Sequence, residues 1–517
     1  MAAPDLRTMR TVRELIDVRA TSDPSATYFI APHTGRSLTF KELRDSCVAV
    51  STMIAARGVQ PGDHVSLVLG NGIQTIQLLL GAIYGGYCVH PVNLLAQPEQ
   101  MHYVIEHADA RIVFAAPDWI ERLRALTGTI GRPIDVIAVD PDGISLPGEG
   151  ALSDVREPPI DPTPDALALL MYTSGTTGKP KGVMLTQANL AANALAISRE
   201  HCLGSSDRVA AVLPLYHINA FAVTMLAPLA HGGSLVMPPK FSVAGFWEMA
   251  IEHGCTWLNV VPTIVSYLLE GEAPARARLS RIRFCRSASA SLPPEHHRAF
   301  EAKFGIGIIE TLGLTETVAP AFSNPIEPQL RKIGSVGRAS GCEARVVDQT
   351  GAPIADGSIG EIVVRGPQVT PGYYKNPDAT VAAFFPGHWL RTGDLGYRDT
   401  DGFFFITGRI KELIIKGGEN IAPREIDEAL LRHPAVLDAA AVGIPDRHYG
   451  QDIMACVVVR DGHRCSEQEL RDFCSRELGR YKTPKVIRFV NDLPRGPSGK
   501  VQRLKLAELA PDASAAA

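Results

Sequence analysis

Apolar residues in the first part of the chain alternate between helical spacing and short continuous runs. Residues 40–56 are apolar on one helix face, which predicts a helix. Short runs typical of strands lie at residues 63–70, 111–114, 136–139, 166–171, 209–213 and 235–237. Because strands that alternate with helices form mostly parallel sheets wrapped by helices, we expect an α/β fold.

The pattern changes near residue 340. Two β-branched runs with charged ends, at residues 344–348 and 361–365, are separated by turns rich in Gly and Pro. Such runs are typical of antiparallel strands. We therefore expect a small antiparallel β subdomain over about residues 335–408.

The last hundred residues show a third pattern. A helix, two strands and a second helix are expected at residues 423–433, 439–442, 455–459 and 467–478, before a basic, Gly-rich tail. About 410 residues precede this segment, which is too many for one core. We expect a large N-terminal domain over residues 1–410 and a small, mobile α+β C-terminal domain over residues 411–517.

Composition limits the class of protein. The chain has 517 residues, with 51 basic and 55 acidic side chains and a net charge of −4, so nothing attracts it globally to nucleic acid or an anionic membrane. Its apolar runs are far shorter than the roughly 20 residues of a membrane span. The nine cysteines include no Cys-x-x-Cys pair, which argues against a disulfide framework or a zinc site. We expect a cytoplasmic protein without a nucleic-acid partner, and leave a homodimer open.

The strongest chemical signal is the segment of residues 172–183, Tyr-Thr-Ser-Gly-Thr-Thr-Gly-Lys-Pro-Lys-Gly-Val, which follows an expected strand. Glycines let backbone N–H groups approach an anion, hydroxyls donate hydrogen bonds and two lysines supply charge. Gly175 and Gly178 enclose only two residues, so this is not a Walker loop. The segment predicts a phosphate-binding loop, with a surface linker as the weaker alternative.

This segment resembles the phosphate loop of the adenylate-forming superfamily, which contains acyl-CoA synthetases, luciferases and adenylation domains. Further motifs follow in that family's order: a Gly-x-Thr-Glu element, a ribose-binding turn, a hinge and a C-terminal lysine loop, at residues 313–317, 391–394, 408–412 and 493–500. The resemblance implies an AMP-forming acid–CoA ligase. In such an enzyme an acid and ATP give an acyl-adenylate and diphosphate, and the CoA thiol then displaces AMP.

The resemblance also implies roles for residues, in a reaction where catalysis is mostly positioning and neutralisation of phosphate charge. The expected catalytic residues are Lys500, Thr315, Glu316 and His217. The expected ATP-binding residues are Thr173, Ser174, Gly175, Thr176, Thr177, Gly178, Lys179, Lys181, Ser289, Ala290, Ser291, Glu310, Thr311, Leu312, Asp394 and Arg409. Glu316 and Thr176 are the expected ligands of Mg²⁺, which prefers oxygen ligands and phosphates.

The hinge of the family falls on Lys411, about which the C-terminal domain is expected to rotate between the two half-reactions. The expected CoA-binding residues are Lys416, Gly417, Gly418, Tyr481 and Lys482. The two glycines would let the narrow CoA arm pass close to the backbone. For Tyr481 and Lys482, a solvated helix end is an equally weighted alternative.

The acyl pocket of this family corresponds here to Tyr216, His217, Asn219, Val261, Arg286 and Leu314. By the two-residue period of a strand, Arg286 shares an apolar face with Ile282 and Phe284. A buried arginine needs an anionic partner, because an uncompensated charge is costly. That partner is either a structural Asp or Glu or an acidic group on the substrate.

The motif from Arg286 to Ser291 most resembles the oxalate–CoA ligase branch, with two departures. Asn219, Ala220 and Phe221 replace a stretch that contains histidine, and Val318 and Ala319 stand where that branch has a polar residue. Leu312 is a departure from the wider family, which usually has an aromatic residue beside adenine at this position. We therefore expect a small acid, either oxalate-like or sulfoacetate-like. A short or medium-chain fatty acid or a carnitine-type acid is the alternative, and a module that loads a carrier protein is the alternative from another class.

Overall fold

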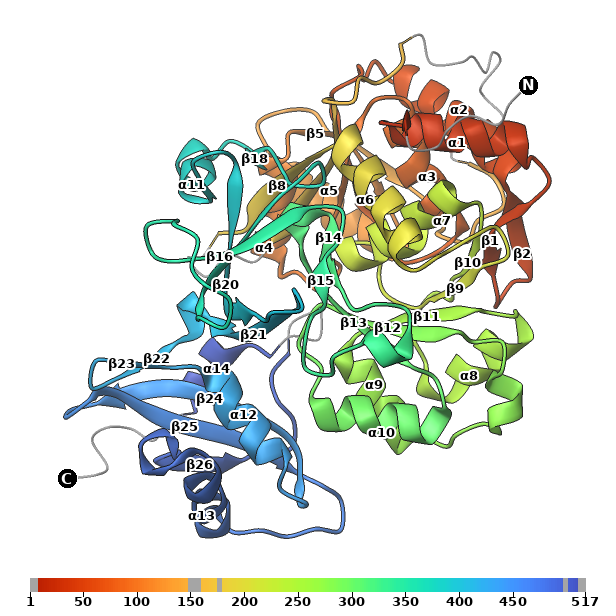
Figure 1. The fold of residues 1–517 in the computed structure, drawn as a ribbon. Helices are drawn as coiled ribbons and strands as arrows, with labels where there is room; N and C mark the ends of the chain where they lie inside the picture. Colours follow the sequence, from red (N-terminus) through yellow and green to blue (C-terminus); the bar gives the residue numbers. More distant parts are fainter. Residues whose placement is uncertain (1–7, 147–159, 174–178, 496–500, 510–517) are drawn as a thin grey trace.

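The computed structural model describes residues 8–146, 160–173, 179–495 and 501–509 (Figure 1). The chain builds a large body, coloured red to cyan in Figure 1, from three sheets and their helices. A smaller unit with a fourth sheet follows, coloured blue, and lies beside the β20 and β21 region.

The largest sheet has nine strands in the spatial order β15-β14-β13-β12-β11-β9-β10-β1-β2. They are β1 (Thr27–Ala31), β2 (Arg36–Thr39), β9 (Arg208–Ala211), β10 (Ser234–Val236), β11 (Trp257–Val260), β12 (Phe284–Ser287), β13 (Ile308–Leu314), β14 (Ala319–Ser323) and β15 (Arg338–Ala339). The strands from β13 to β1 in this order run parallel, and antiparallel strands complete both edges.

A second sheet has seven strands in the order β18-β8-β7-β4-β3-β5-β6. They are β3 (His64–Val68), β4 (Cys88–Pro91), β5 (Ala110–Ala115), β6 (Asp135–Ala138), β7 (Leu167–Thr173), β8 (Lys181–Thr186) and β18 (Gly372–Tyr373). β7 and β8 pair antiparallel, and their register sets Thr173 opposite Lys181. The stems of the expected phosphate loop therefore face each other across this strand pair.

Two further sheets are mainly antiparallel. One contains β16 (Glu343–Val347), β17 (Gly360–Arg365), β19 (Phe384–Phe385), β20 (Trp389–Arg398) and β21 (Phe404–Arg409). The other contains β22 (Ile414–Lys416), β23 (Glu419–Ile421), β24 (Val436–Asp446), β25 (Gly450–Val459) and β26 (Val486–Phe489). Only β26 in the last sheet pairs parallel, with β25.

Helices cover these sheets. They are α1 (Val12–Ser22), α2 (Phe40–Ala55), α3 (Ile73–Tyr84), α4 (Pro98–His107), α5 (Ile120–Thr127), α6 (Gln187–Glu200), α7 (Ala227–His231), α8 (Val243–Glu252), α9 (Pro262–Glu270), α10 (Pro294–Phe304), α11 (Pro377–Ala382), α12 (Pro423–Leu431), α13 (Glu467–Leu478) and α14 (Arg503–Ala507). Capping boxes fix the starts of α1 and α2, where Thr11 pairs with Glu14 and Thr39 with Glu42. Such reciprocal bonds satisfy N–H groups that the first turn leaves unpaired.

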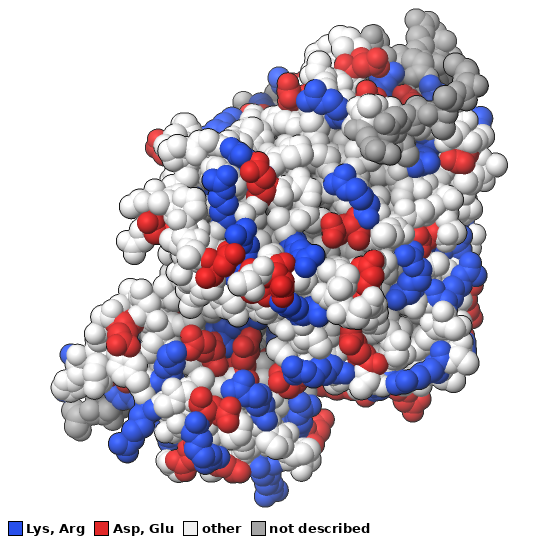
Figure 2. Space-filling view, viewed as in Figure 1, with Lys and Arg blue, Asp and Glu red and all other residues white. Residues whose placement is uncertain are grey.

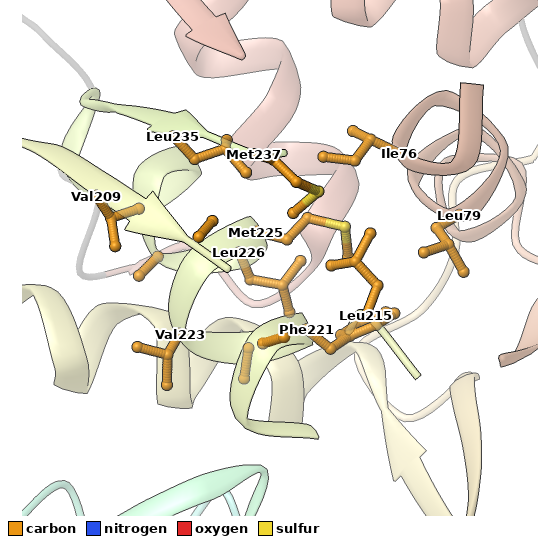
Figure 3. Packing of buried hydrophobic residues seen from close by; sticks show 14 of the residues in the cluster. Ile76, Leu79, Val209, Leu215, Phe221, Val223, Met225, Leu226, Leu235 and Met237 are labelled. Carbon is orange, nitrogen blue, oxygen red and sulfur yellow. The ribbon is translucent and has the colours of Figure 1, made fainter. Parts of the chain in front are cut away.

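The main core lies between the two large sheets. α6 contacts β7 and β8 of one sheet and β14 of the other, so it bridges them. Beside it, the π-helical segment η4 (Asn219–Leu226) buries Phe221, Met225 and Leu226 against side chains from α3, β9 and β10 (Figure 3). The segment that begins at Asn219 is therefore held in place by the core.

The distribution of charged side chains on the surface agrees with the small net charge of the chain. Basic and acidic side chains intermingle over the face shown in Figure 2. Among the described helices, none is both long and apolar enough to cross a bilayer.

The expected α/β fold with parallel sheets, an antiparallel β part and an α+β C-terminal unit is confirmed. The helix expected at residues 467–478 has those bounds, and the strand at residues 439–442 extends further, as β24. The boundary between residues 410 and 411 stays a prediction.

Candidate active site

The expected acyl pocket lies at one edge of the nine-stranded sheet. β9, β11, β12 and β13 are neighbouring parallel strands, so their carboxyl ends meet at this edge. Ligands of α/β proteins bind at such edges. Tyr216 and His217 follow β9, Val261 follows β11 and the turn from Ala288 to Ser291 follows β12. Tyr216 and His217 lie with ring centroids 4.7 Å apart.

Arg286 is the charged centre of this region. It lies on β12, is 1% exposed and sits in register beside Asn259 of β11. Its Nη1 donates to Oδ1 of Asn259 and to Oδ1 of Asn219, both at 2.7 Å. Its Nε is buried and has no hydrogen-bond partner in the described part of the chain.

The charge of Arg286 is not offset by an acid. Within the described residues, it forms no ion pair with an Asp or Glu, and both hydrogen bonds go to neutral amides. Burial alone lowers the pKa of Arg286 from its ordinary value to about 9. Of the two partners expected from the sequence, the structural carboxylate is missing from the described residues.

The Gly-x-Thr-Glu element begins in the last two residues of β13 and continues into the short helix that follows. A Cβ on Gly313 would stand 1.8 Å from the carbonyl oxygen of Ala319, so only glycine fits at this close approach. Thr315 and Glu316 lie half-buried in the short helix η6 (Thr315–Thr317), and Val318 closes it at a φ of +55°. A β-branched residue rarely adopts this conformation, which marks local strain.

Glu316 lies beside the stem of the expected phosphate loop. The Tyr373 hydroxyl donates to Oε1 of Glu316 at 2.8 Å, and Nζ of Lys181 lies 5.1 Å from the centroid of the same ring. The loop residues Ser174, Gly175, Thr176, Thr177 and Gly178 lie outside the described residues. Lys179 is exposed, and its Nζ lies 5.3 Å from the Tyr103 ring centroid.

These residues fit a Mg²⁺ ion that arrives with ATP. Mg²⁺ is usually held by one or two carboxylates together with substrate phosphates. Glu316 offers one half-buried carboxylate beside the lysine of the loop stem. In the described ranges, no group of three or more His, Cys, Asp and Glu side chains is placed to hold a metal. Thr176 is outside these ranges.

The expected nucleotide residues lie around the end of β13. Leu312 and Gly313 line one small cavity with Thr392 and Asp394 of β20. Ser289 is exposed at a φ of +75°, and Ala290 and Ser291 continue the same turn. Thr311 is buried, and so is Glu310, whose Oε1 accepts from the Leu292 amide at 3.3 Å and whose pKa is raised by burial.

Asp394 and Arg409 form an ion pair. They face each other on β20 and β21, and Nε of Arg409 lies 2.6 Å from Oδ1 of Asp394. Arg409 therefore holds the carboxylate of a residue that lines the small cavity. Lys411 follows directly in the exposed segment η8 (Ile410–Glu412).

The expected CoA residues cluster around the β22–β23 turn. Gly417 and Gly418 have φ values of +56° and +89°, and open space surrounds the Cβ position of Gly418. Lys416 is 7% exposed, and its Nζ lies 2.6 Å from Oδ1 of Asp452. Tyr481 donates its hydroxyl to the Lys416 carbonyl, while Lys482 pairs with Glu425. Lys500 lies outside the described residues.

Sequence reasoning missed two residues of the site. Asn259 carries a signal, since it is a polar residue inside the apolar run Trp257 to Val260. Tyr373 carries none, because only the pairing of β18 with β8 brings it near Glu316.

The chain resembles known enzymes over nearly its whole length. The model for AMP-binding enzymes matches residues 16–374, and that for their C-terminal domain matches residues 425–500. A sulfoacetate–CoA ligase of Cupriavidus necator is 59% identical, over 96% of this chain and 97% of that protein. An oxalate–CoA ligase of Arabidopsis thaliana is 34% identical, over 89% of this chain and 91% of that protein.

Solved structures of similar proteins share the fold of this chain. ATP-bound MatB from Rhodopseudomonas palustris superposes with a TM-score of 0.91 at 32% identity, covering 97% of this chain and 99% of that one. The matched motifs, the two matched domain models and the shared fold lead to one conclusion: the chain belongs to the family of AMP-binding enzymes.

Proposed function

We propose that this protein is an ATP-dependent, AMP-forming ligase that couples a small acid with a second anionic group to CoA, and that sulfoacetate is its first candidate substrate. The observation that supports an anionic substrate is the environment of Arg286, a buried guanidinium without a carboxylate partner in the described residues. An anionic group on the substrate would supply the negative charge that no Asp or Glu of the described residues brings to Arg286. The similarity to a sulfoacetate–CoA ligase supports the same choice.

In the first half-reaction the substrate carboxylate attacks the α-phosphorus of ATP and diphosphate leaves. Lys181 and the phosphate loop would bind the diphosphate part, and Thr315 would contact the α-phosphate. Mg²⁺ at Glu316 would neutralise phosphate charge. Asp394, oriented by Arg409, would accept the ribose hydroxyls. Lys500 would bridge the carboxylate and the α-phosphate, and these electrostatic contacts are worth most in a site that excludes water.

In the second half-reaction the CoA thiol attacks the acyl carbon and AMP leaves. We propose that residues 411–517 rotate about Lys411 between the two steps. Gly417 and Gly418 already hold a left-handed backbone, and the open space at Gly418 leaves room for the pantetheine arm. Lys416 is less suited to bind CoA, because its charge is already paired with Asp452.

We also propose a cytoplasmic location. All nine cysteines are free thiols, as expected in a reducing compartment. A homodimer stays a prediction, which light scattering of the purified protein would test.

A screen of diphosphate release tests the function. Sulfoacetate, oxalate, malonate, butyrate, crotonobetaine and benzoate are each supplied with ATP, Mg²⁺ and CoA, and the thioester is identified by mass spectrometry. We expect turnover with acids that carry a second anionic group, highest with sulfoacetate. Preference for butyrate would refute the anionic substrate. Acylation of a holo-carrier protein in place of free CoA would refute the ligase.

A further inference from the structure

The two asparagines that hold Arg286 are both buried and both neutral. Asn219 is 4% exposed at the start of η4, and Asn259 is 0% exposed on β11. An arginine has donors only, so the atoms that face its Nη1 must be the amide oxygens. The Nδ2 of Asn219 then donates to Oγ of Ser289 at 3.2 Å, and Nδ2 of Asn259 lies 3.4 Å from Oδ1 of Asn219.

A carboxylate in either place would hold Arg286 at least as well. Aspartate has the size of asparagine and offers the same acceptor oxygen, and its negative charge would add an ion pair to the hydrogen bond. The protein uses this stronger arrangement elsewhere, where Nε of Arg409 meets Oδ1 of Asp394 at 2.6 Å. At Arg286 the amides fix the guanidinium and leave its charge uncompensated.

We propose that Asn219 and Asn259 are specificity-determining positioning residues, which hold Arg286 with neutral oxygens so that its charge selects acids with a second anionic group. They act through Arg286 and also tie it to the turn that follows β12, because Asn219 bonds to Ser289. This inference rests on the proposed function, since it requires an anionic substrate.

Asn259→Asp keeps the acceptor of Nη1 and adds one negative charge, and it loses only the long 3.4 Å bond from Nδ2 to Asn219. We expect the KM for sulfoacetate to rise at least about tenfold, as the added carboxylate neutralises Arg286. The KM for ATP should stay unchanged. The thermal midpoint should hold or rise, because a buried charge gains a partner. Asn219→Asp should act in the same direction, and its second carboxylate oxygen can accept from the Ser289 hydroxyl in place of the present bond.

Asn376→Asp is the matched control. Asn376 caps α11, its Oδ1 accepts from the Ala379 amide, and aspartate is an equally good cap. It adds the same charge away from Arg286 and should leave the KM for sulfoacetate unchanged.

The result that overturns the inference is an unchanged KM for sulfoacetate in Asn259→Asp and Asn219→Asp while both stay folded, since a merely structural acceptor would be satisfied by aspartate. An equal rise in the KM for ATP would overturn it as well. Failure of the wild-type protein to use any acid with a second anionic group is a different result, which refutes the proposed function itself.

Discussion

Two regions of this molecule hold an arginine in opposite ways. Arg286 in the proposed acyl pocket bonds to two neutral amides. Arg503 of α14 pairs with Asp427 of α12 and, through Nε at 3.3 Å, with Glu412 near the hinge. The C-terminal region thus compensates its partly buried charge internally, whereas the proposed pocket leaves the charge of Arg286 without a carboxylate in the described residues. This difference teaches that a buried cation that its own protein does not neutralise is a candidate site for an anionic ligand.

The largest effect is expected from breaking the ion pair between Asp427 and Arg503. Asp427→Asn keeps the size of the side chain but leaves Arg503 without its main partner, which should cost about 3 kcal/mol of unfolding free energy. Hydrogen exchange of α12 and β24 would measure the loss. Glu425→Gln, in the more exposed pair with Lys482, is the control and should cost under about 1 kcal/mol. Equal losses in the two variants would remove the distinction between buried and surface pairs.

The next largest effect is expected at Arg286, whose charge has no carboxylate partner in the described residues. Arg286→Met removes an uncompensated buried charge but leaves Oδ1 of Asn259 without its donor, so we expect only a small net change in the unfolding free energy. It should lower kcat/KM for sulfoacetate by roughly 10- to 100-fold, because the substrate anion loses its counter-charge. Steady-state kinetics and urea unfolding of the same preparation measure both. A strong destabilisation with unchanged kcat/KM would make Arg286 structural and end the contrast between the two regions.

A smaller effect is expected at the glycine turn of the C-terminal region. Gly418→Leu places a side chain at a φ of +89° in the proposed CoA path. We expect roughly a tenfold loss of thioester formation from supplied acyl-adenylate, with little change in acid-dependent exchange between ATP and diphosphate. Gly462, also at a positive φ and in open space on the loop after β25, gives the matched variant Gly462→Leu. Damage to both half-reactions alike would argue against a path at this turn.

The smallest effect is expected at His201, whose pKa responds to the charge of Arg286. Burial, and then the charge of Arg286, lower the pKa of His201 to about 3. In the unfolded chain, the pKa of His201 is near its ordinary value of 6.5. Between the two pKa values the unfolded state therefore binds a proton that the folded state does not bind. His201 therefore costs stability progressively as pH falls from about 6.5 toward 3.

Arg286→Met should move the pKa of His201 upward, which NMR titration of the imidazole detects. A pKa that does not move would show that the charge of Arg286 is already screened in the wild-type protein.

The sequence predicts the elements well, because their signals are local. The helix from Phe40 and the strands around Val65 and Val209 follow from periodicity within a few residues. The class of enzyme also followed from ordered motifs and is confirmed by the comparisons. The site could be predicted only in part. That Asn259 meets Arg286 depends on the register of two strands, and that Tyr373 meets Glu316 depends on a pairing between distant segments.

The edge strands of the two large sheets have a consequence for synthesis on the ribosome. The seven-stranded sheet starts at β3 and gains its last strand, β18, only when residues 372–373 have been made. The β1–β2 hairpin is made first, yet it pairs with β10 some two hundred residues later. The side of β1 that β10 later covers is therefore without its partner strand until about residue 236 has been made. Because unpaired strand edges favour aggregation, we expect this hairpin to be a vulnerable part of the nascent chain.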